Sequence, residues 1–333
     1  MSAVDAPLPP ALDGPRRAFT LTELLMVMGI IAILAGLALS ALSGATELAR
    51  TQRTRAIINK IDQLIMDRYE SYRTRAVPVP QAMRQAAQNN PRVAAQNRLN
   101  ALRELMRMEL PDRVSDVVDG PVTGIPAPSV WQGYRRRAFA TLGATWTTNW
   151  TTEHQGAECL YLILASMQDG DKSALDFFTP DEIGDTDGDG MKEILDGWGR
   201  PIGFLRWAPG YLPHNGALTT QDASVPDPFD PVKIDPRWSG TGIAIGGITV
   251  KPFALRPLIF SSGPDREGGI VVDRSNAVLH YSATTPFNDP YYLPPDVPHL
   301  GTPMDFDPAG NHVIGLAANR HRDNLTNHYV EVP

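Results

Sequence analysis

The sequence lacks the features that would indicate a disulfide-stabilised or nucleic-acid-binding protein. Cys159 is the only cysteine among its 333 residues, which excludes an intrachain disulfide. It lies in an apolar helical stretch, where we expect a small buried core residue. The formal net charge is −7, from 30 basic and 37 acidic residues. A nucleic-acid binder usually presents a basic face, so the composition argues against a nucleic-acid partner.

Catalytic signatures are also missing. The chain has no Gly-x-Ser-x-Gly, no phosphate-binding loop, no nucleotide fingerprint and no His-Glu-x-x-His. The seven histidines are scattered, and we expect His321 and His328 to be surface residues. Asp265 and Glu267 are interpreted as turn residues rather than as a carboxylate pair. No catalytic residue is assigned, and an anchored enzyme is the least favoured function.

Charge and proline are absent from one long apolar run near the start, residues 24–45. Its only polar residues are Ser40 and Ser43. As a helix rising 1.5 Å per residue, roughly 20 such residues cross the hydrocarbon core of a bilayer. A plain signal anchor would carry such a run too, but Glu23 lies at its edge, where a buried carboxylate is costly without a partner. Two arginines at 16–17 precede the run, so we expect the leader to stay cytoplasmic and the rest to be exported.

The stretch from Arg16 to Glu23 reads Arg-Arg-Ala-Phe-Thr-Leu-Thr-Glu. Together with the apolar run, it resembles the N-terminal signal of type IV pilins and type II secretion pseudopilins. The resemblance implies that a prepilin peptidase cuts between Ala18 and Phe19. It also implies that the new amine is often methylated and that Glu23, the fifth mature residue, acts in assembly. The sequence departs from the family in having Ala18 where Gly is usual, in its long leader, and in lacking a proline near Ser40.

The same resemblance implies a location, partners and a function. The chain would be anchored in the inner membrane by one helix, with a cytoplasmic N-terminus and an extracytoplasmic C-terminal domain, before it joins a filament. Its partners would be other pilin or pseudopilin subunits, the prepilin peptidase and an inner-membrane assembly platform. The implied function is a structural subunit of a type II secretion pseudopilus or a type IV pilus-like filament. The alternative is a minor subunit at the filament tip, acting as a membrane-anchored binding module.

The apolar pattern after the run predicts an α+β fold. Ile57, Ile61 and Ile65 recur on one helix face, so the long helix should continue to about residue 75, before a break at 77–80. We expect this helix to pack on a small antiparallel sheet, with helical insertions. The predicted boundaries are a leader 1–18, a membrane or filament-core helix 19–45, its amphipathic continuation 46–80, a helical insertion and helix 81–180, and a loop-rich β domain 181–333.

Shorter elements follow from the same patterns. Further helices are expected at 81–110, 130–142 and 153–167. Short strands are expected at 201–207, 243–250, 255–261, 269–273 and 312–317. Between them lie loops rich in proline and aspartate, in which Asp-Pro pairs recur at Asp227, Asp230, Asp235, Asp289 and Asp307.

Parts of the C-terminal half are also similar to the major pseudopilins. Residues 196–202, Asp-Gly-Trp-Gly-Arg-Pro-Ile, resemble the Asp-Pro-Trp-Gly-x-Pro turn that the family places before a strand. Residues 260–269 resemble its Ser-x-Gly-x-Asp-Gly-x-x-Gly-Gly loop, with Arg266 where a Gly would be. Residues 323–327 resemble its acidic end. The resemblance leaves 80–180 unexplained.

An acidic loop has the spacing of an EF-hand calcium loop at most positions. The expected Ca²⁺ ligands are Asp185, Asp187, Asp189, the backbone carbonyl of Met191, Glu193 and Asp196. Ca²⁺ takes six to eight oxygens, and Asp196 stands where a longer Glu is usual, which would weaken binding. No strong helix pair flanks the loop, so it would be a lone calcium loop. A solvated acidic turn is the alternative.

Overall fold

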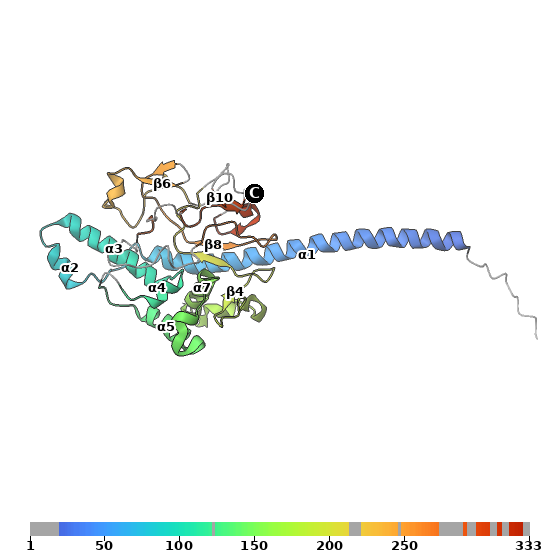
Figure 1. Ribbon diagram of the computed structural model, residues 1–333, viewed down its shortest axis with the longest axis horizontal. Helices are drawn as coiled ribbons and strands as arrows, with labels where there is room; N and C mark the ends of the chain where they lie inside the picture. The colour runs from blue at the N-terminus through green and yellow to red at the C-terminus, as the bar shows by residue number, and fades with distance from the viewer. Residues whose placement is uncertain are drawn as a thin grey trace, which may run out of the picture. The chain divides into compact units, whose positions relative to one another are not determined.

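The structure is a computed structural model that describes residues 20–121, 124–212, 221–245, 248–272, 289–291, 298–306, 312–314 and 320–328. Contacts within the chain form two compact units, Met1–Leu48 and Ala49–Pro333. One helix, α1 (Leu21–Ser71), makes up nearly all of the described first unit and continues into the second (Figure 1).

The first unit is the apolar part of α1. Every described side chain from residue 20 to residue 50 is exposed. By length and composition the helix can cross a membrane. Ser40 Oγ donates a hydrogen bond to Leu37 O at 2.9 Å, and Ser43 Oγ donates to Ser40 O at 2.8 Å. Because each hydroxyl is satisfied within the helix, the two serines are compatible with an apolar surrounding.

The second unit begins where α1 becomes amphipathic. The buried residues of α1 are Thr54, Ile57, Ile58, Ile61, Ile65 and Tyr69. The apolar ones are those that the three- and four-residue spacing predicts. The helix ends at Ser71, slightly before the expected residue 75, because the next two N–H groups bond three residues back in a tighter turn. In Figure 1, helices α4, α5 and α7 lie on one side of this part of α1, and strands β6, β8 and β10 lie on the other.

The remaining helices are mostly those that the sequence predicts. The α-helices are α2 (Gln81–Ala86), α3 (Pro91–Glu109), α4 (Val114–Val118), α5 (Ser129–Leu142), α6 (Trp146–Asn149) and α7 (Gln155–Ser166). The 3₁₀ turns are η1 (Gly143–Thr145), η2 (Ala174–Phe177), η3 (Pro180–Glu182), η4 (Pro236–Trp238) and η6 (Arg320–Asp323). The helices expected at 130–142 and 153–167 are α5 and α7.

The helix expected at 81–110 is two helices rather than one. Asn90 caps α3, since its side chain accepts hydrogen bonds from Arg92 N at 3.1 Å and Val93 N at 3.2 Å. Pro91 occupies the first turn of α3. Proline has no N–H to donate within a helix, so the Asn-Pro pair begins a new helix instead of continuing α2.

The strands are short and antiparallel. They are β1 (Gln168–Asp169), β2 (Lys172–Ser173), β3 (Ile183–Gly184), β4 (Glu193–Ile194), β5 (Gly203–Leu205), β6 (Ile243–Ile245), β7 (Ile248–Val250), β8 (Leu258–Ser261), β9 (Met304–Phe306), β10 (His312–Ile314) and β11 (Leu325–Thr326). In the main sheet, β8 is central between β5 and β11, with Phe204 opposite Ile259 and Thr326 opposite Phe260. The other strands form the pairs β1–β2, β3–β4, β6–β7 and β9–β10. The α+β class is therefore confirmed.

Two strand predictions are wrong in detail. The expected strand 243–250 is the β6–β7 hairpin, because a Gly-Gly pair at its centre favours a two-residue turn. The described part of the expected strand 269–273 makes only an isolated bridge, from Ile270 to Pro303. Gly269 has a φ of +54°, which interrupts extended backbone there. Asp273 and residues 315–317 of the strand expected at 312–317 lie outside the described residues.

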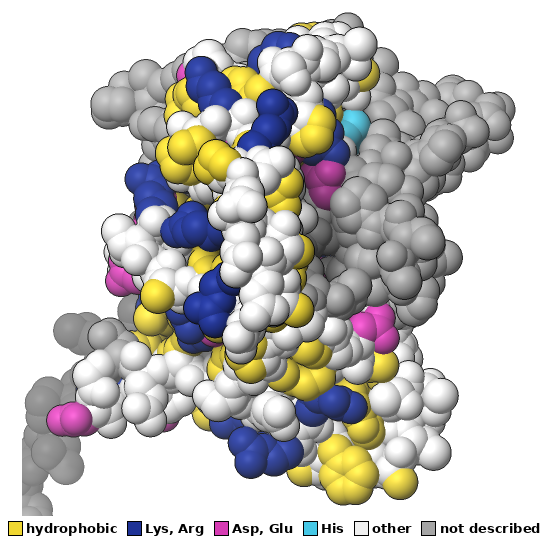
Figure 2. All heavy atoms as spheres, turned by 90° about the vertical axis from the view of Figure 1, so that its left-hand side faces the viewer, with side chains coloured by type: hydrophobic (Ala, Val, Ile, Leu, Met, Phe, Trp, Pro, Cys, Tyr) yellow, Lys and Arg dark blue, Asp and Glu magenta, His cyan; other side chains and the backbone are white. Residues whose placement is uncertain are grey.

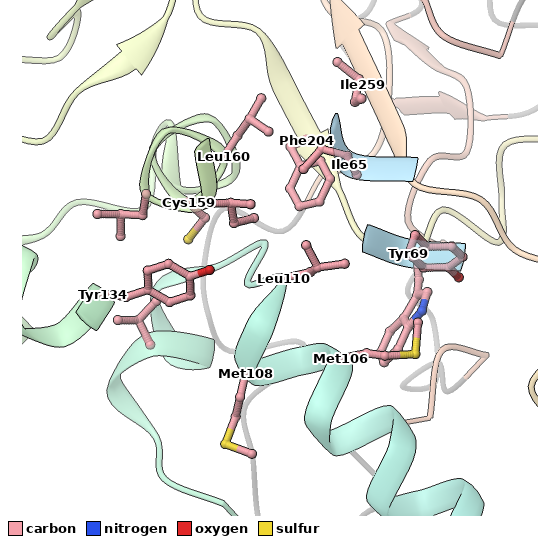
Figure 3. Close-up of a cluster of buried hydrophobic side chains, with 14 of the residues drawn as sticks. Ile65, Tyr69, Met106, Met108, Leu110, Tyr134, Cys159, Leu160, Phe204 and Ile259 are labelled. Carbon is pink, nitrogen blue, oxygen red and sulfur yellow. The ribbon is translucent and has the colours of Figure 1, made fainter. Parts of the chain in front are cut away.

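The core of the second unit lies between α1, the inserted helices and the main sheet. The labelled side chains of Figure 3 are Ile65, Tyr69, Met106, Met108, Leu110, Tyr134, Cys159, Leu160, Phe204 and Ile259. They come from α1, the end of α3, α5, α7, β5 and β8. Cys159 is buried and unpaired, as the sequence predicts. The inserted helices are therefore part of the same core. Burying each of these side chains stabilises the fold by roughly 1.5–3 kcal/mol.

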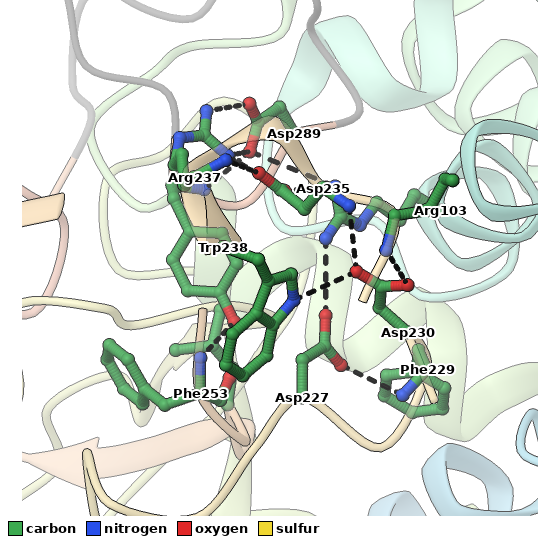
Figure 4. Close-up of polar contacts among 12 residues, drawn as sticks. Arg103, Asp227, Phe229, Asp230, Asp235, Arg237, Trp238, Phe253 and Asp289 are labelled. Atoms are coloured by element: carbon green, nitrogen blue, oxygen red, sulfur yellow. Dashed lines mark hydrogen bonds and ion pairs between the residues drawn. The ribbon is translucent and has the colours of Figure 1, made fainter. Parts of the chain in front are cut away.

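A second buried cluster is ionic (Figure 4). Four of the aspartates that precede proline meet there: Asp227, Asp230, Asp235 and Asp289. Arg103 of α3 pairs with Asp227 at 3.2 Å and with Asp235 at 3.5 Å, and all three residues are buried. Arg237 pairs with Asp235 at 3.0 Å and also with Asp289. The recurrent Asp-Pro pairs thus connect the proline-rich loops to α3.

Candidate functional site

The N-terminal signal is described from Thr20 onward. Ala18 and Phe19, between which cleavage is expected, lie outside the described residues. Thr20 and Glu23 form a capping box at the start of α1. Thr20 N and Thr20 Oγ1 both donate to Glu23 Oε2 at 2.9 Å, and Glu23 N donates to Thr20 Oγ1 at 3.2 Å. The Thr-x-x-Glu spacing is the sequence signal for this cap.

The helix after Glu23 presents a continuous apolar surface. Its exposed large side chains are Leu24, Leu25, Met26, Val27, Met28, Ile30, Ile31, Ile33, Leu34, Leu37, Leu39 and Leu42. Apolar surface of this extent is typical of a segment that lipid or other apolar helices cover. Membrane anchoring is the general conclusion that this helix supports.

The acidic loop connects β3 to β4, so it is the tip of a hairpin. Asp185 accepts hydrogen bonds from Gly188 N at 2.8 Å and from Gly190 N at 3.0 Å. The two glycines have φ values of +78° and +102°. Left-handed backbone of this kind favours glycine, which explains the Gly at position 6 of the loop pattern. No helix pair flanks this loop in the described chain, in agreement with the sequence.

Carboxylates from three segments meet at this loop. Asp185, Asp187 and Glu193 each place an oxygen within 4.8 Å of the others, and so do Asp187, Asp189 and Glu158. Glu158 comes from α7 and was not among the expected ligands. The sequence does carry a sign of its special role, because Glu158 is the only charged residue among the buried positions of α7, a helix that the sequence predicts.

Asp196 is not in either group. Asp196 Oδ1 accepts hydrogen bonds from Trp198 N at 2.8 Å and Arg200 N at 2.9 Å, and Asp196 Oδ2 accepts from Ser261 Oγ at 2.6 Å. It therefore holds the turn expected at 196–202. Met191 has a buried side chain and donates its N–H to Asp189 Oδ1 at 2.8 Å.

The two glutamates near the loop have strongly shifted pKa values. Burial raises the pKa of Glu158 to about 9; the hydrogen bond from Trp150 opposes this, and the negative charge of Asp189 adds to it. Burial raises the pKa of Glu193 to about 7, opposed by the hydrogen bond from Thr186 N. Both environments disfavour a bare carboxylate.

Two expectations about other polar residues have opposite outcomes. Asp265 and Glu267 are turn residues as predicted, since Glu267 N donates to Asp265 Oδ1 at 2.7 Å. The surface assignment of His321 and His328 is wrong, because both are buried. The His328 ring lies edge-on to Tyr211, with 5.4 Å between ring centres, and His328 Nε2 is 3.0 Å from Pro257 O.

Comparison with known proteins supports the assignment of the N-terminus. The family model of the prokaryotic N-terminal methylation motif matches residues 14–39. This match spans the paired arginines, Ala18, Phe19, Glu23 and most of the apolar run. No curated protein and no solved structure matches the chain. The motif, the long apolar helix and the α+β arrangement are consistent with a type IV pilin or pseudopilin. In general terms, such a motif implies processing by a prepilin peptidase and assembly with other pilin subunits.

Proposed function

We propose that the chain is a structural subunit of a type II secretion pseudopilus or a type IV pilus-like filament. The observation that carries the proposal is the match to the methylation motif at residues 14–39, at the start of an uncovered apolar helix. The precursor is anchored in the inner membrane with its second unit outside the cytoplasm. After cleavage between Ala18 and Phe19, the apolar helices of neighbouring subunits bundle and leave the lipid.

The proposal is tested first at the processing site. Membrane-extracted protein is subjected to N-terminal sequencing and intact-mass measurement, in cells with and without a prepilin peptidase. We expect the mature chain to begin at Phe19 only when the peptidase is present. Ala18→Gly, which keeps a small residue before the cut, should be processed, whereas Ala18→Leu should accumulate as precursor. A wild-type chain that begins at Met1, or after the apolar run, would refute the proposal.

A second candidate, a minor subunit at the filament tip, is favoured by the inserted helices. Figure 2 shows a face of the second unit formed by α2 and α3, over which Lys and Arg side chains are spread and Asp and Glu side chains are few. Arg84, Arg92 and Arg98 of these helices are exposed. Such a face would suit an acidic partner.

The two candidates predict different amounts of the chain in a filament. A main structural subunit would be the most abundant pilin in sheared and purified filaments, as measured by quantitative mass spectrometry. A tip subunit would be present at a few copies per filament, and its removal would reduce filament number more than filament length. Abundance above that of every other pilin would exclude the tip assignment.

A further inference from the structure

The acidic loop has a feature that a solvated turn does not explain, which is a pair of buried carboxylate oxygens without donors. Glu158 and Glu193 are both 0% exposed. Glu158 Oε2 accepts from Trp150 Nε1 at 2.6 Å, and Glu193 Oε2 accepts from Thr186 N at 3.1 Å. Their Oε1 atoms have no hydrogen-bond partner among the described residues. A buried acceptor without a partner is costly, so native structures usually satisfy it with a donor, a water or an ion.

The two glutamates belong to two overlapping groups of carboxylates. Glu158 offers an oxygen within 4.8 Å of oxygens of Asp187 and Asp189. Glu193 offers one within the same distance of oxygens of Asp185 and Asp187. Asp187 belongs to both groups, so carboxylates of the loop, of β4 and of α7 all lie near it.

We propose that a Ca²⁺ ion binds beside Asp187, where the two groups overlap, and that Glu158 of α7 is one of its ligands. It takes the place that the loop pattern gives to Asp196, whose oxygens are occupied by the following turn. The remaining side-chain ligands come from the loop and β4, and they are Asp185, Asp187, Asp189 and Glu193.

The number and the chemistry of the candidate ligands favour Ca²⁺. All the candidate ligands are carboxylate oxygens, which bind hard cations such as Ca²⁺ and Mg²⁺. Ca–O distances of about 2.3–2.6 Å place opposite ligands about 4.6–5.2 Å apart. Oxygens that lie within 4.8 Å of one another can therefore contact one such ion together. Mg²⁺ requires a tighter octahedron and keeps several waters, so a set of many carboxylates suits it less.

Binding would join segments that are distant in the sequence. Thr151 N already donates to Asp189 Oδ2 at 2.8 Å, which holds the loop near the start of α7. An ion shared with Glu158 would fix the hairpin tip to that helix directly. The site is independent of filament assembly, so a negative result here would leave the processing experiment unaffected.

The test is calorimetric titration of the detergent-solubilised full chain with CaCl₂ and with MgCl₂ after treatment with chelator. We expect one Ca²⁺ per chain and at least tenfold weaker Mg²⁺ binding. Glu158→Gln and Asp187→Asn should each lower the Ca²⁺ affinity at least tenfold. Asp171→Asn, which changes an exposed acid outside the site, should bind as the wild type does. Asp196→Asn should also keep the affinity, although it loosens the turn.

Melting curves recorded in chelator show whether each variant is folded. Gln keeps the shape of Glu158 and an acceptor for Trp150, so the Glu158→Gln chain should melt as the wild type does without calcium. Only the wild type and the controls should then gain melting temperature with millimolar CaCl₂. Absence of Ca²⁺ binding by the wild type would overturn the site. Unchanged affinity in Glu158→Gln, with binding lost in Asp187→Asn, would overturn the role of Glu158.

Discussion

His328 shows how one buried side chain makes stability depend on pH. Its ring is fully buried, and its Nε2 lies against Pro257 O. Burial lowers the pKa of His328 to about 4, opposed by the contact with Pro257 O, while the positive charge of Arg256 lowers it further. The ring is therefore neutral in the folded chain at pH 7, and its Nε2 carries the hydrogen that it donates to the carbonyl.

The sign of the effect follows from proton binding. Between pH 6.5 and 4, the unfolded chain binds a proton at this imidazole and the folded chain does not. The free energy of unfolding should therefore fall as the pH falls through this window, by roughly 3 kcal/mol at most, and should be insensitive to this group above pH 7. Urea unfolding at several pH values should show a smaller loss in His328→Gln. Some loss will remain, because burial lowers the pKa of His299 as well. Equal slopes in both chains would contradict this account.

At the residue scale, the sequence predicted part of the carboxylate cluster at the acidic loop. Loop spacing identified Asp185, Asp187 and Asp189, because these residues are close along the chain. It could not find Glu158, which reaches the loop only through the packing of α7. It also assigned Asp196 to the expected calcium loop, whereas the turn at Trp198 offers that carboxylate two N–H donors. The sequence places Arg266 where the resembled loop has Gly, and the structure gives Arg266 a φ of +64°, in the left-handed region that favours Gly.

At the scale of elements, the ionic cluster around Arg103 connects α3 to the proline-rich loops. Asp230 accepts hydrogen bonds from Ile234 N at 2.8 Å, Asp235 N at 2.9 Å and Trp238 Nε1 at 3.1 Å. This orders a loop that contains little regular structure. Arg103 neutralises the neighbouring carboxylates, so its charge is needed where water cannot reach.

Replacing Arg103 should therefore be severely destabilising. Arg103→Met keeps the apolar part of the side chain, leaves Asp227 without its ion-pair partner and leaves Asp235 with Arg237 alone, at an expected cost of about 3–5 kcal/mol. Arg98→Met, which changes an exposed arginine on the same helix, should stay within about 0.5 kcal/mol of the wild type. Urea denaturation of the two variants provides the comparison. Similar stability for both would show that the cluster contributes little.

The elements themselves were predicted with uneven success, for physical reasons. Helices α5 and α7 follow from apolar residues at helical spacing, which is a local signal. The split at Asn90-Pro91 was also a local signal, which the prediction of one helix over 81–110 did not use. A strand as short as β11 depends on pairing with β8, which no local pattern reports. The Asp-Pro pairs were visible in the sequence, but their common role depends on Arg103, which is more than a hundred residues away from them.

At the scale of the whole molecule, Glu23 relates the single chain to a filament. In the chain alone its carboxylate caps α1 through Thr20. Within an apolar bundle the same carboxylate would carry a burial penalty of several kcal/mol, which the amine of Phe19 on a neighbouring subunit would offset. The pairing would also set the axial register of the subunits.

Two variants of Glu23 separate the cap from the charge. Glu23→Ala removes both, and Glu23→Gln keeps an acceptor for Thr20 N but loses the charge. If the ion pair matters, both variants should insert into the membrane and be cleaved, yet be depleted at least tenfold from purified filaments, as measured by immunoblotting against the membrane pool. Normal incorporation of Glu23→Gln would show that only the helix cap is needed.

The burial of Cys159 makes the chain suitable for site-specific labelling. Burial raises the pKa of its thiol well above the usual range, so at neutral pH it stays protonated and closed to alkylating reagents. A second cysteine introduced on the surface, for example by Asp171→Cys, would be the only reactive thiol in the protein. Neighbouring subunits could then be crosslinked, or one subunit followed with a fluorophore, without first removing a native cysteine.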